Sequence, residues 1–432
     1  MADDVRFEEP LQGVYPFADA GVAIEVCQAE GAFGQEPIGP LRLWMPMRSD
    51  AHLRWAASGP GGASLFEASD LSLQHPNFGL VAAPVMALGD QWGTVQAVNV
   101  GTGSNLDRVL VHWVNLPQIL PGRPLRNGGS TWSGRWDLET CGWKLTLDSR
   151  MDLSSALRSA AEADEQFLLT HVGEVRRAAG GTFDAETVTH LLFGWQLAMS
   201  FALGRWVAPA LPNGFDTDDR RVWEQWAPWR CDTVRGYEAW WNTHSGADLS
   251  EFVDAFLRAF LDPAEHPVVR HVAMHVITAN HSGTTAEGKV MLAQAGLEYL
   301  SWVGLVLSGR MSKKAYRSMP SAADRLRLML GDAGIGTGVP DGLDGLFQFA
   351  NSEGLDGPDV VTWARNRLVH PKDPAEPYRI EHLVWQAAQL LLEYGELLLL
   401  HRLGYHGGFR RRYPPHRWVG TSEPVPWADT GL

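Results

Sequence analysis

The sequence predicts an α+β protein in which a β-rich N-terminal half, a sandwich or curved sheet, is followed by an all-α helical bundle. Up to about residue 150, short segments alternate apolar and polar residues with a period of two, which is typical of half-buried strands. Turns rich in Gly and Pro separate these segments. Beyond about residue 220, apolar residues recur at helical spacing instead. This change of period predicts two structural classes within one chain.

The N-terminal half is expected to contain strands at residues 95–100, 109–114 and 143–147. A helix over 153–163, a strand over 166–176 and a helix over 184–202 follow, with Asp184 or Thr182 as the last N-cap. Residues 209–219 combine Pro, Asn, Gly and Asp, which predicts a loop, and no strand is expected after it.

The C-terminal half is expected to be helical. Apolar residues at helical spacing predict helices over 249–260, 267–279, 285–307, 321–330, 358–370 and 380–403. The domains expected from these patterns are a β-rich domain at 1–150, an α/β extension at 151–210, a helical connector at 211–262, a helical domain at 263–412 and a basic, Pro-rich tail at 413–432.

The composition excludes several classes of protein. With 45% hydrophobic residues and 19 Trp, the chain can bury enough apolar surface to fold. A net charge of -14 argues against a surface that attracts nucleic acid or membranes throughout, so any phosphate site must be local. Three scattered cysteines support neither a disulfide framework nor a cysteine zinc site. We expect a cytoplasmic protein with no cofactor, no metal and no membrane partner.

One motif stands out among possible chemical sites. Arg365 is followed by Asn366 and, five residues after the Arg, by His370. The bare Arg-to-His spacing recurs at Arg270 and at Arg411, but only the 365–370 segment has Asn directly after the Arg. This requirement lowers the number of matches expected by chance from about one to about 0.025.

The helical spacing places this motif on one side of a helix. Val361, Ala364 and Leu368 form an apolar stripe, while Asn366 and His370 lie on the opposite face. Arg365 lies at the flank, where it can reach either an internal carboxylate or Asn366 and His370. Pro371 disfavours helical geometry at His370 and so predicts the helix end there.

The C-terminal 150 residues resemble the HEPN superfamily, and in particular its Apea-like group. The resemblance lies in the helical domain, in the Arg-Asn-x-x-x-His-Pro end of its penultimate helix and in the long last helix running into residues 403–409. More loosely, residues 191–204 and 223–229 are similar to what precedes this domain in multidomain members. The resemblance implies a metal-independent endoribonuclease, active as a homodimer whose motifs face each other, often in anti-phage or toxin systems.

The resemblance also assigns roles to the motif. Arg365 would neutralise the attacked phosphate, His370 would transfer a proton and Asn366 would orient an oxygen or the imidazole. A toxin subgroup of the superfamily carries an adenylylated Tyr two residues after the His, where this chain has Lys372. Regulation by that route is therefore not expected.

Other residues complete the expected site. Glu298 lies in an apolar helix and either pairs with Arg365 or a tail arginine, or points to solvent beside Gln294. A strip from His401 to Trp418 lacks carboxylates, and its aromatic residues suit RNA bases. The expected RNA-binding residues are Arg402, Arg410, Arg411 and Arg412. The alternative is that these arginines pair with acidic residues elsewhere in the chain.

Two further possibilities remain open. His271 and His275 have the spacing of a zinc pair, but a third ligand is not evident, and Arg270 with His275 is the fallback catalytic pair. The N-terminal half is expected to sense a trigger, either phage-derived or a small molecule. The alternative to a nuclease is a non-catalytic HEPN scaffold for binding or dimerisation, whose β-rich domain recognises a ligand or protein partner.

Overall fold

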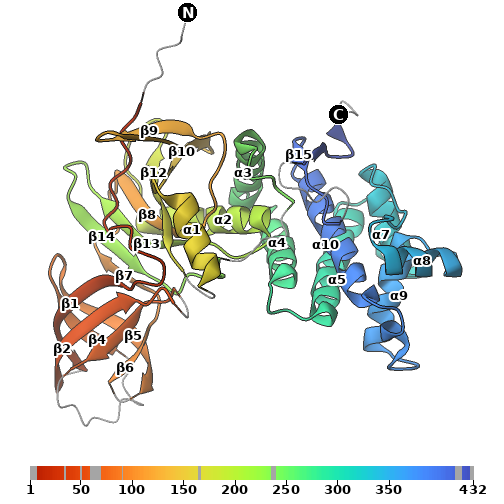
Figure 1. The fold of residues 1–432 in the computed structure, drawn as a ribbon, viewed down its shortest axis with the longest axis horizontal. Coiled ribbons are helices and arrows are strands. Elements are labelled where there is room, and N and C mark those ends of the chain that lie inside the picture. The colour runs from red at the N-terminus through yellow and green to blue at the C-terminus, as the bar shows by residue number, and fades with distance from the viewer. Residues whose placement is uncertain are drawn as a thin grey trace, which may run out of the picture. The chain divides into compact units, whose positions relative to one another are not determined.

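The computed structural model describes residues 7–33, 36–48, 51–58, 70–89, 91–163, 167–234, 240–413 and 421–428. The chain divides into two compact units. The N-terminal unit comprises Met1–Gln196 and Val207–Gly236, and the helical unit comprises Leu197–Trp206 and Tyr237–Leu432. A β-rich N-terminal half and a helical C-terminal half confirm the predicted α+β class (Figure 1).

Six strands at the start of the N-terminal unit form a closed barrel in the order β1-β2-β3-β6-β5-β4 (Figure 1). They are β1 (Ile24–Phe33), β2 (Glu36–Met45), β3 (Arg54–Ala57), β4 (Asp70–His75), β5 (Gly79–Gly89) and β6 (Trp92–Val95). Alternate residues such as Leu43, Trp55 and Leu71 are fully buried in its core. The barrel closes because β1 pairs with both β2 and β4, a long-range pairing that the alternating pattern does not encode.

An eight-stranded antiparallel sheet follows, in the order β7-β14-β13-β8-β12-β11-β10-β9. Its strands are β7 (Val98–Gly101), β8 (Arg108–Val114), β9 (Arg123–Asn127), β10 (Ser130–Thr140), β11 (Trp143–Ser149), β12 (Leu169–Arg177), β13 (Ala208–Phe215) and β14 (Arg221–Trp226). Helix α1 (Leu153–Glu162) belongs to this region, and α2 (Ala185–Leu203) starts in it and continues into the helical unit from Leu197. As predicted, Asp184 caps α2, because its Oδ1 accepts a hydrogen bond from the Thr187 N–H at 2.7 Å.

The expectation of a loop over 209–219 with no later strand was wrong. Residues 208–215 form β13, and β14 follows it. All but the last residue of β13 are buried, so the strand shows no alternation. Its register against β8 shifts between Ala210 and Asn213, and this irregularity accommodates Pro212, which has no N–H to donate.

Besides the end of α2, the helical unit contains eight α-helices within the described residues. They are α3 (Gly246–Leu261), α4 (His266–Asn280), α5 (Ala286–Trp302), α6 (Lys313–Ser318), α7 (Ala322–Asp332), α8 (Asp344–Glu353), α9 (Gly357–Val369) and α10 (Leu383–Arg402). A π-helical turn, Val303–Leu307, extends α5, and a short 3-10 helix, Glu376–Tyr378, follows α9. Six of the eight correspond to helices that the spacing predicted; α6 and α8 were not anticipated. Strands β15 (Gly408–Phe409) and β16 (Glu423–Pro424) pair after α10.

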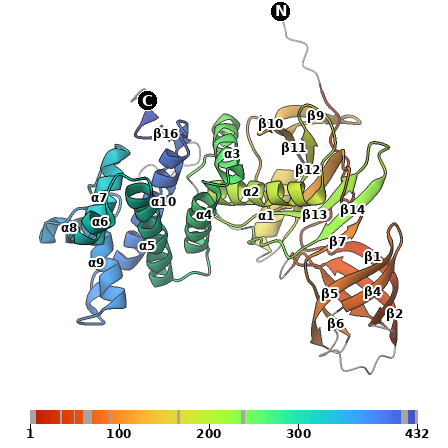
Figure 2. The same ribbon diagram turned by 180° about the vertical axis from the view of Figure 1, so that it is seen from behind.

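Helix α10 forms the centre of the helical unit. Every residue from Gln386 to Leu400 is buried. Figures 1 and 2 both show this helix between α4 on one side and α7 to α9 on the other. Burial on all sides explains why most of its residues are apolar. The polar exceptions, Gln386, Gln389, Glu393 and Glu396, are buried as well.

Two helices in the described residues are long and apolar enough to cross a membrane, Ala286–Leu307 and Leu383–Arg402. In the second, 94% of the most apolar window is buried inside the protein, and in the first 56% is buried. Such burial is typical of core helices in soluble proteins, which pass the same length and hydropathy criteria.

Candidate functional site

Helix α9 carries Arg365, Asn366 and His370 at its C-terminal end. The helix packs against α5, α7 and α10. As the helical spacing predicts, Val361 and Ala364 are fully buried, whereas Asn366 and His370 are exposed. The apolar face therefore holds the helix in the bundle and leaves two of the three motif residues accessible to solvent.

The N-terminal end of α9 is anchored by charge pairs. Asp356 is the N-cap, and its Oδ1 accepts a hydrogen bond from the Asp359 N–H at 3.0 Å. Arg327 of α7 donates to both carboxylates, at 2.7 Å to Asp356 and at 2.7 Å to Asp359. These bonds join the N-terminal end of α9 to α7 and so restrain the helix that carries the motif.

The C-terminal end of α9 lies at His370, as Pro371 predicts. His370 has φ -129° and ψ 64°, outside the helical range, while its N–H still donates to the Asn366 carbonyl at 2.8 Å. Proline disfavours helical geometry in the residue before it, which explains the position of this end. The imidazole is consequently presented at the last turn.

The structure resolves the two alternatives for Arg365 in favour of Asn366. The Arg365 Nη1 donates to the Asn366 Oδ1 at 3.2 Å. Arg367, two residues further on, instead pairs with Glu376 at 2.7 Å. Among the described residues, Arg365 makes no ion pair with a carboxylate. Its charge thus remains available to an anionic ligand.

Lys372 is a second cation beside the motif that sequence reasoning did not assign to the site. It is exposed, two residues after His370, and it forms no ion pair with the described part of the chain. The neighbouring Arg379, by contrast, pairs with Asp373. The one signal in the sequence was the position of this lysine directly after His370 and Pro371.

Glu298 does not join the motif in the described structure. Its Oε1 accepts a hydrogen bond from the Gln294 side chain at 3.1 Å, one helical turn earlier on α5. The residue is half-buried. Of the alternatives left by the sequence, the geometry matches the one that places Glu298 beside Gln294, but Gln294 is only 3% exposed, so of the two only Glu298 reaches solvent.

The expected RNA-binding strip is not an open cationic surface, which corrects that expectation. Its described arginines are Arg402, Arg410, Arg411 and Arg412. Arg402 pairs with Glu265 at 2.9 Å, and Arg411 pairs with Glu393 at 2.7 Å. Arg410 is buried. The intervening aromatic residues Tyr405, Phe409 and Tyr413 are buried too, so they offer no face to a base. Arg417 and Trp418 lie outside the described residues.

Arg412 is the most deeply enclosed of these cations, with a side chain only 1% exposed. Its Nε donates to Glu396 at 2.8 Å, and its Nη1 donates to Asn280 at 3.0 Å. Burial raises the pKa of Glu396, and the adjacent guanidinium opposes that shift. The chain reverses after α10 and brings the strip back onto glutamates of that helix, which local charge counting cannot reveal.

The two histidines on α4, His271 and His275, stack on each other and on a tyrosine of α5. The ring of His275 lies 4.2 Å from that of His271, which lies 3.9 Å from Tyr299 of α5. Burial, followed by the nearby His275, lowers the pKa of His271. No group of three or more His, Cys, Asp or Glu suited to a metal occurs among the residues that the structure describes.

Comparison with known proteins places similarity in both units. Residues 101–237 match the YopA central domain, and residues 262–423 match the YopA C-terminal domain. The SPbeta prophage-derived uncharacterized protein YopA of Bacillus subtilis (strain 168) is 29% identical over 316 residues, which cover 71% of this chain and 69% of that protein. No solved structure matches. The chain is therefore similar to YopA in most of the eight-stranded sheet and in the helical unit, and the second matched range spans α9.

Proposed function

We propose that the helical unit is a metal-independent endoribonuclease of the HEPN type, with Arg365, Asn366 and His370 as its catalytic residues. The observation that supports this proposal is the hydrogen bond that Arg365 makes. Its guanidinium contacts Asn366 instead of a carboxylate, and His370 is exposed at the end of the same helix. Lys372 adds a second cation beside the motif.

The proposed reaction uses the substrate's own nucleophile. The ribose 2′-hydroxyl attacks the adjacent phosphorus, a cyclic phosphate forms and the bond to the 5′-oxygen breaks. Arg365 neutralises the phosphate, Asn366 orients an oxygen or the imidazole, and His370 transfers a proton at the attacking or leaving oxygen. DNA lacks the 2′-hydroxyl and is not a substrate.

The proposal includes a homodimer and a role in defence. In one copy Asn366 and His370 are exposed, so a second copy facing them across a two-fold axis would enclose the RNA phosphate. The Bacillus subtilis relative is described as prophage-derived, which agrees with an anti-phage or toxin-like role, and the proposed location is the cytoplasm. The N-terminal unit would then act as a sensor or regulator.

The test is cleavage of labelled RNA and DNA by the purified full-length protein in EDTA. We expect RNA cleavage that resists the chelator and falls at least about 100-fold in both Arg365→Ala and His370→Ala. Arg258→Ala is the matched control, because Arg258 is an exposed arginine of the same unit and pairs with Asp254 on α3.

Intact RNA would count against the enzyme if it persisted after an extract of phage-infected cells was added to folded protein. A stable dimer in that experiment would favour the non-catalytic scaffold. Cleavage that is unchanged in both motif variants would assign the activity to other residues.

A further inference from the structure

Tyr378 is the most exposed of the Phe, Tyr and Trp residues that the structure describes, at 56%. It ends the 3-10 helix that follows α9, eight residues after His370. A ring in this position adds little to the core, because apolar burial stabilises a fold in proportion to the area removed from water. The aromatic surface of Tyr378 is therefore accessible to a ligand.

The hydroxyl of Tyr378 is held in place although the residue is exposed. It donates to the Glu287 Oε1 at 3.0 Å, in the first turn of α5. A backbone hydrogen bond, together with the one from Tyr378, lowers the pKa of Glu287 and keeps this acceptor charged near neutral pH. Because the ring is already anchored at its polar end, a planar group that stacks on it costs little additional side-chain entropy.

The 3-10 helix is joined to the helix that carries the motif. Glu376 pairs with Arg367 at 2.7 Å, and Arg367 lies three residues before His370 on α9. Figures 1 and 2 both show the C-terminal end of α9 at the same end of the bundle as the N-terminal ends of α5 and α10. Tyr378, which contacts the start of α5, therefore lies at the same end of the bundle as His370.

The end of α9 and the segment after it are less acidic than the chain as a whole. Residues 365–381 contain four Lys or Arg and three Asp or Glu, a net charge of +1, whereas the whole chain carries -14. Two of these three carboxylates are paired with arginines of the same segment. The phosphates of a nucleic acid can therefore approach this end of the bundle with less repulsion than they would meet on the average surface of the protein.

We infer that Tyr378 stacks on an unpaired base of RNA beside the phosphate that Arg365 and His370 would bind. The inference rests on the proposed function, which places the scissile phosphate at these two residues. Aromatic side chains stack on bases of any sequence, but only on bases that are not paired in a duplex. Tyr378 thus selects single-stranded RNA. As a substrate-binding residue without a part in proton transfer, it should change KM more than kcat.

The test measures RNA binding separately from cleavage. The first probe is a fluorescein-labelled adenosine decamer with 2′-O-methyl groups, which block the attacking hydroxyl, and the second is the same backbone without bases. Fluorescence anisotropy with the full-length protein in EDTA gives each Kd. We expect the wild type to bind the adenosine decamer at least about fivefold more tightly than the decamer without bases. Tyr378→Ala should weaken binding of the adenosine decamer about fivefold and leave the other Kd unchanged.

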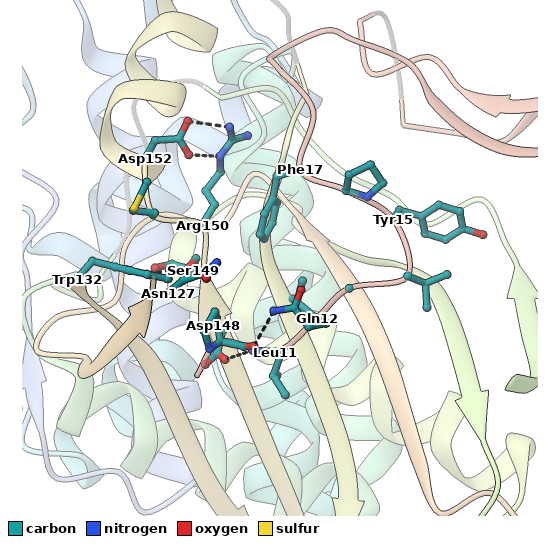
Figure 3. Close-up of a pocket in the computed structure, with 16 residues that line it drawn as sticks. Leu11, Gln12, Tyr15, Phe17, Asn127, Trp132, Asp148, Ser149, Arg150 and Asp152 are labelled. Carbon is teal, nitrogen blue, oxygen red and sulfur yellow. Dashed lines mark hydrogen bonds and ion pairs between the residues drawn. The ribbon is translucent and has the colours of Figure 1, made fainter. Parts of the chain in front are cut away.

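Two variants serve as controls. Tyr378→Phe keeps the ring and loses the hydrogen bond to Glu287, so its Kd for the adenosine decamer should stay within about twofold of the wild type. Phe17→Ala removes another exposed aromatic ring, which lines a pocket of the N-terminal unit (Figure 3), and should leave both Kd values unchanged. Thermal melting shows whether each variant is folded, and Tyr378→Leu replaces Tyr378→Ala if the latter is not.

The inference is overturned if the wild type binds neither decamer or both equally, or if a folded variant without the ring keeps the wild-type Kd. Equal losses in Tyr378→Phe and Tyr378→Ala would assign the effect to the hydrogen bond with Glu287 instead of stacking. Loss of a dimer in Tyr378→Ala, measured by analytical ultracentrifugation, would assign the ring to the contact between copies; either result also overturns stacking. Base-dependent binding by a protein that never cleaves RNA would refute only the proposed nuclease.

Discussion

The end of α9 and the segment after α10 are both rich in arginine, yet the arginines have opposite environments. Arg365 lies near the surface and contacts a neutral amide. Arg412 is enclosed and bonded to Glu396, Asn280 and Gln389. The first cation can meet a ligand without losing an internal partner. The second supports the packing of the chain on α10.

This difference shows that a count of charges along the sequence does not locate a binding surface. The segment after α10 has more arginines than the end of α9, and by charge alone it was the stronger candidate for contact with RNA. The glutamates that neutralise it lie on α10, and folding brings them into contact.

The largest effect is expected at the buried pair. Arg412→Ala would leave Glu396 without its partner and should lower the free energy of unfolding by about 3–5 kcal/mol. Urea unfolding at neutral pH measures the change. The double variant Arg412→Met with Glu396→Leu should recover much of the loss, because no charge is then left uncompensated. A melting curve for Arg412→Ala equal to that of the wild type would contradict the structural role of this arginine.

The second effect is expected on catalysis. Arg365→Lys keeps the positive charge but loses the planar fork, so RNA cleavage should fall at least about tenfold while melting is unchanged. Arg367→Lys is the matched control, since Arg367 lies on the same helix and is already paired with Glu376. Equal losses in the two variants would show that the helix end acts as a general cationic surface.

The third effect concerns buried imidazoles in the N-terminal unit. Burial lowers the pKa of His112 to about 4 and that of His171 to about 3. The unfolded chain takes up these protons near pH 6.5, so each group stabilises the fold above that pH. The contribution declines by about 1.4 kcal/mol per pH unit per group as the pH falls towards the folded pKa.

Urea unfolding of the wild type between pH 7 and pH 4 tests this expectation. His171→Gln removes one titrating group and should reduce the slope of stability against pH. His171 is 1% exposed, so the variant must first be shown to fold at pH 7. An identical slope in a folded variant would show that other groups control the acid response.

The smallest effect is expected for the stability of the motif itself. Arg365→Ala should change the free energy of unfolding by less than about 0.5 kcal/mol, because this arginine donates one hydrogen bond to a neighbouring residue at the surface. The same urea experiment measures it beside Arg412→Ala. If the free energy of unfolding fell by several kcal/mol, Arg365 would be a structural residue like Arg412, and the contrast between the two regions would not hold.

Much of the fold could be predicted from local patterns. Helical spacing identified α3, α4, α5, α7, α9 and α10, and the change from period two to helical spacing identified the α+β class. The barrel and β13 could not be predicted in this way. Barrel closure depends on the pairing of β1 with β4, and β13 is buried so thoroughly that its pattern resembles neither a surface strand nor a helix.

In the candidate site, too, local features could be predicted and long-range contacts could not. The positions of Arg365, Asn366 and His370 on α9 followed from spacing and from Pro371, because a helix end is a local property. The partner of Arg365 and the pairing of the arginines after α10 with glutamates could not be predicted from the sequence. Both depend on which side chains the folded bundle brings within hydrogen-bond distance.

Local chemistry in the chain sufficed for the fold class, for most helices of the helical unit and for the exposed face of α9, since these depend on near neighbours along the backbone. Folding selected which of the chemically identical arginines remain available. It placed Glu393 and Glu396 against Arg411 and Arg412, and it left Arg365 beside an amide. A charge in a protein is defined by its partners, and partners distant in sequence meet only in the packed structure.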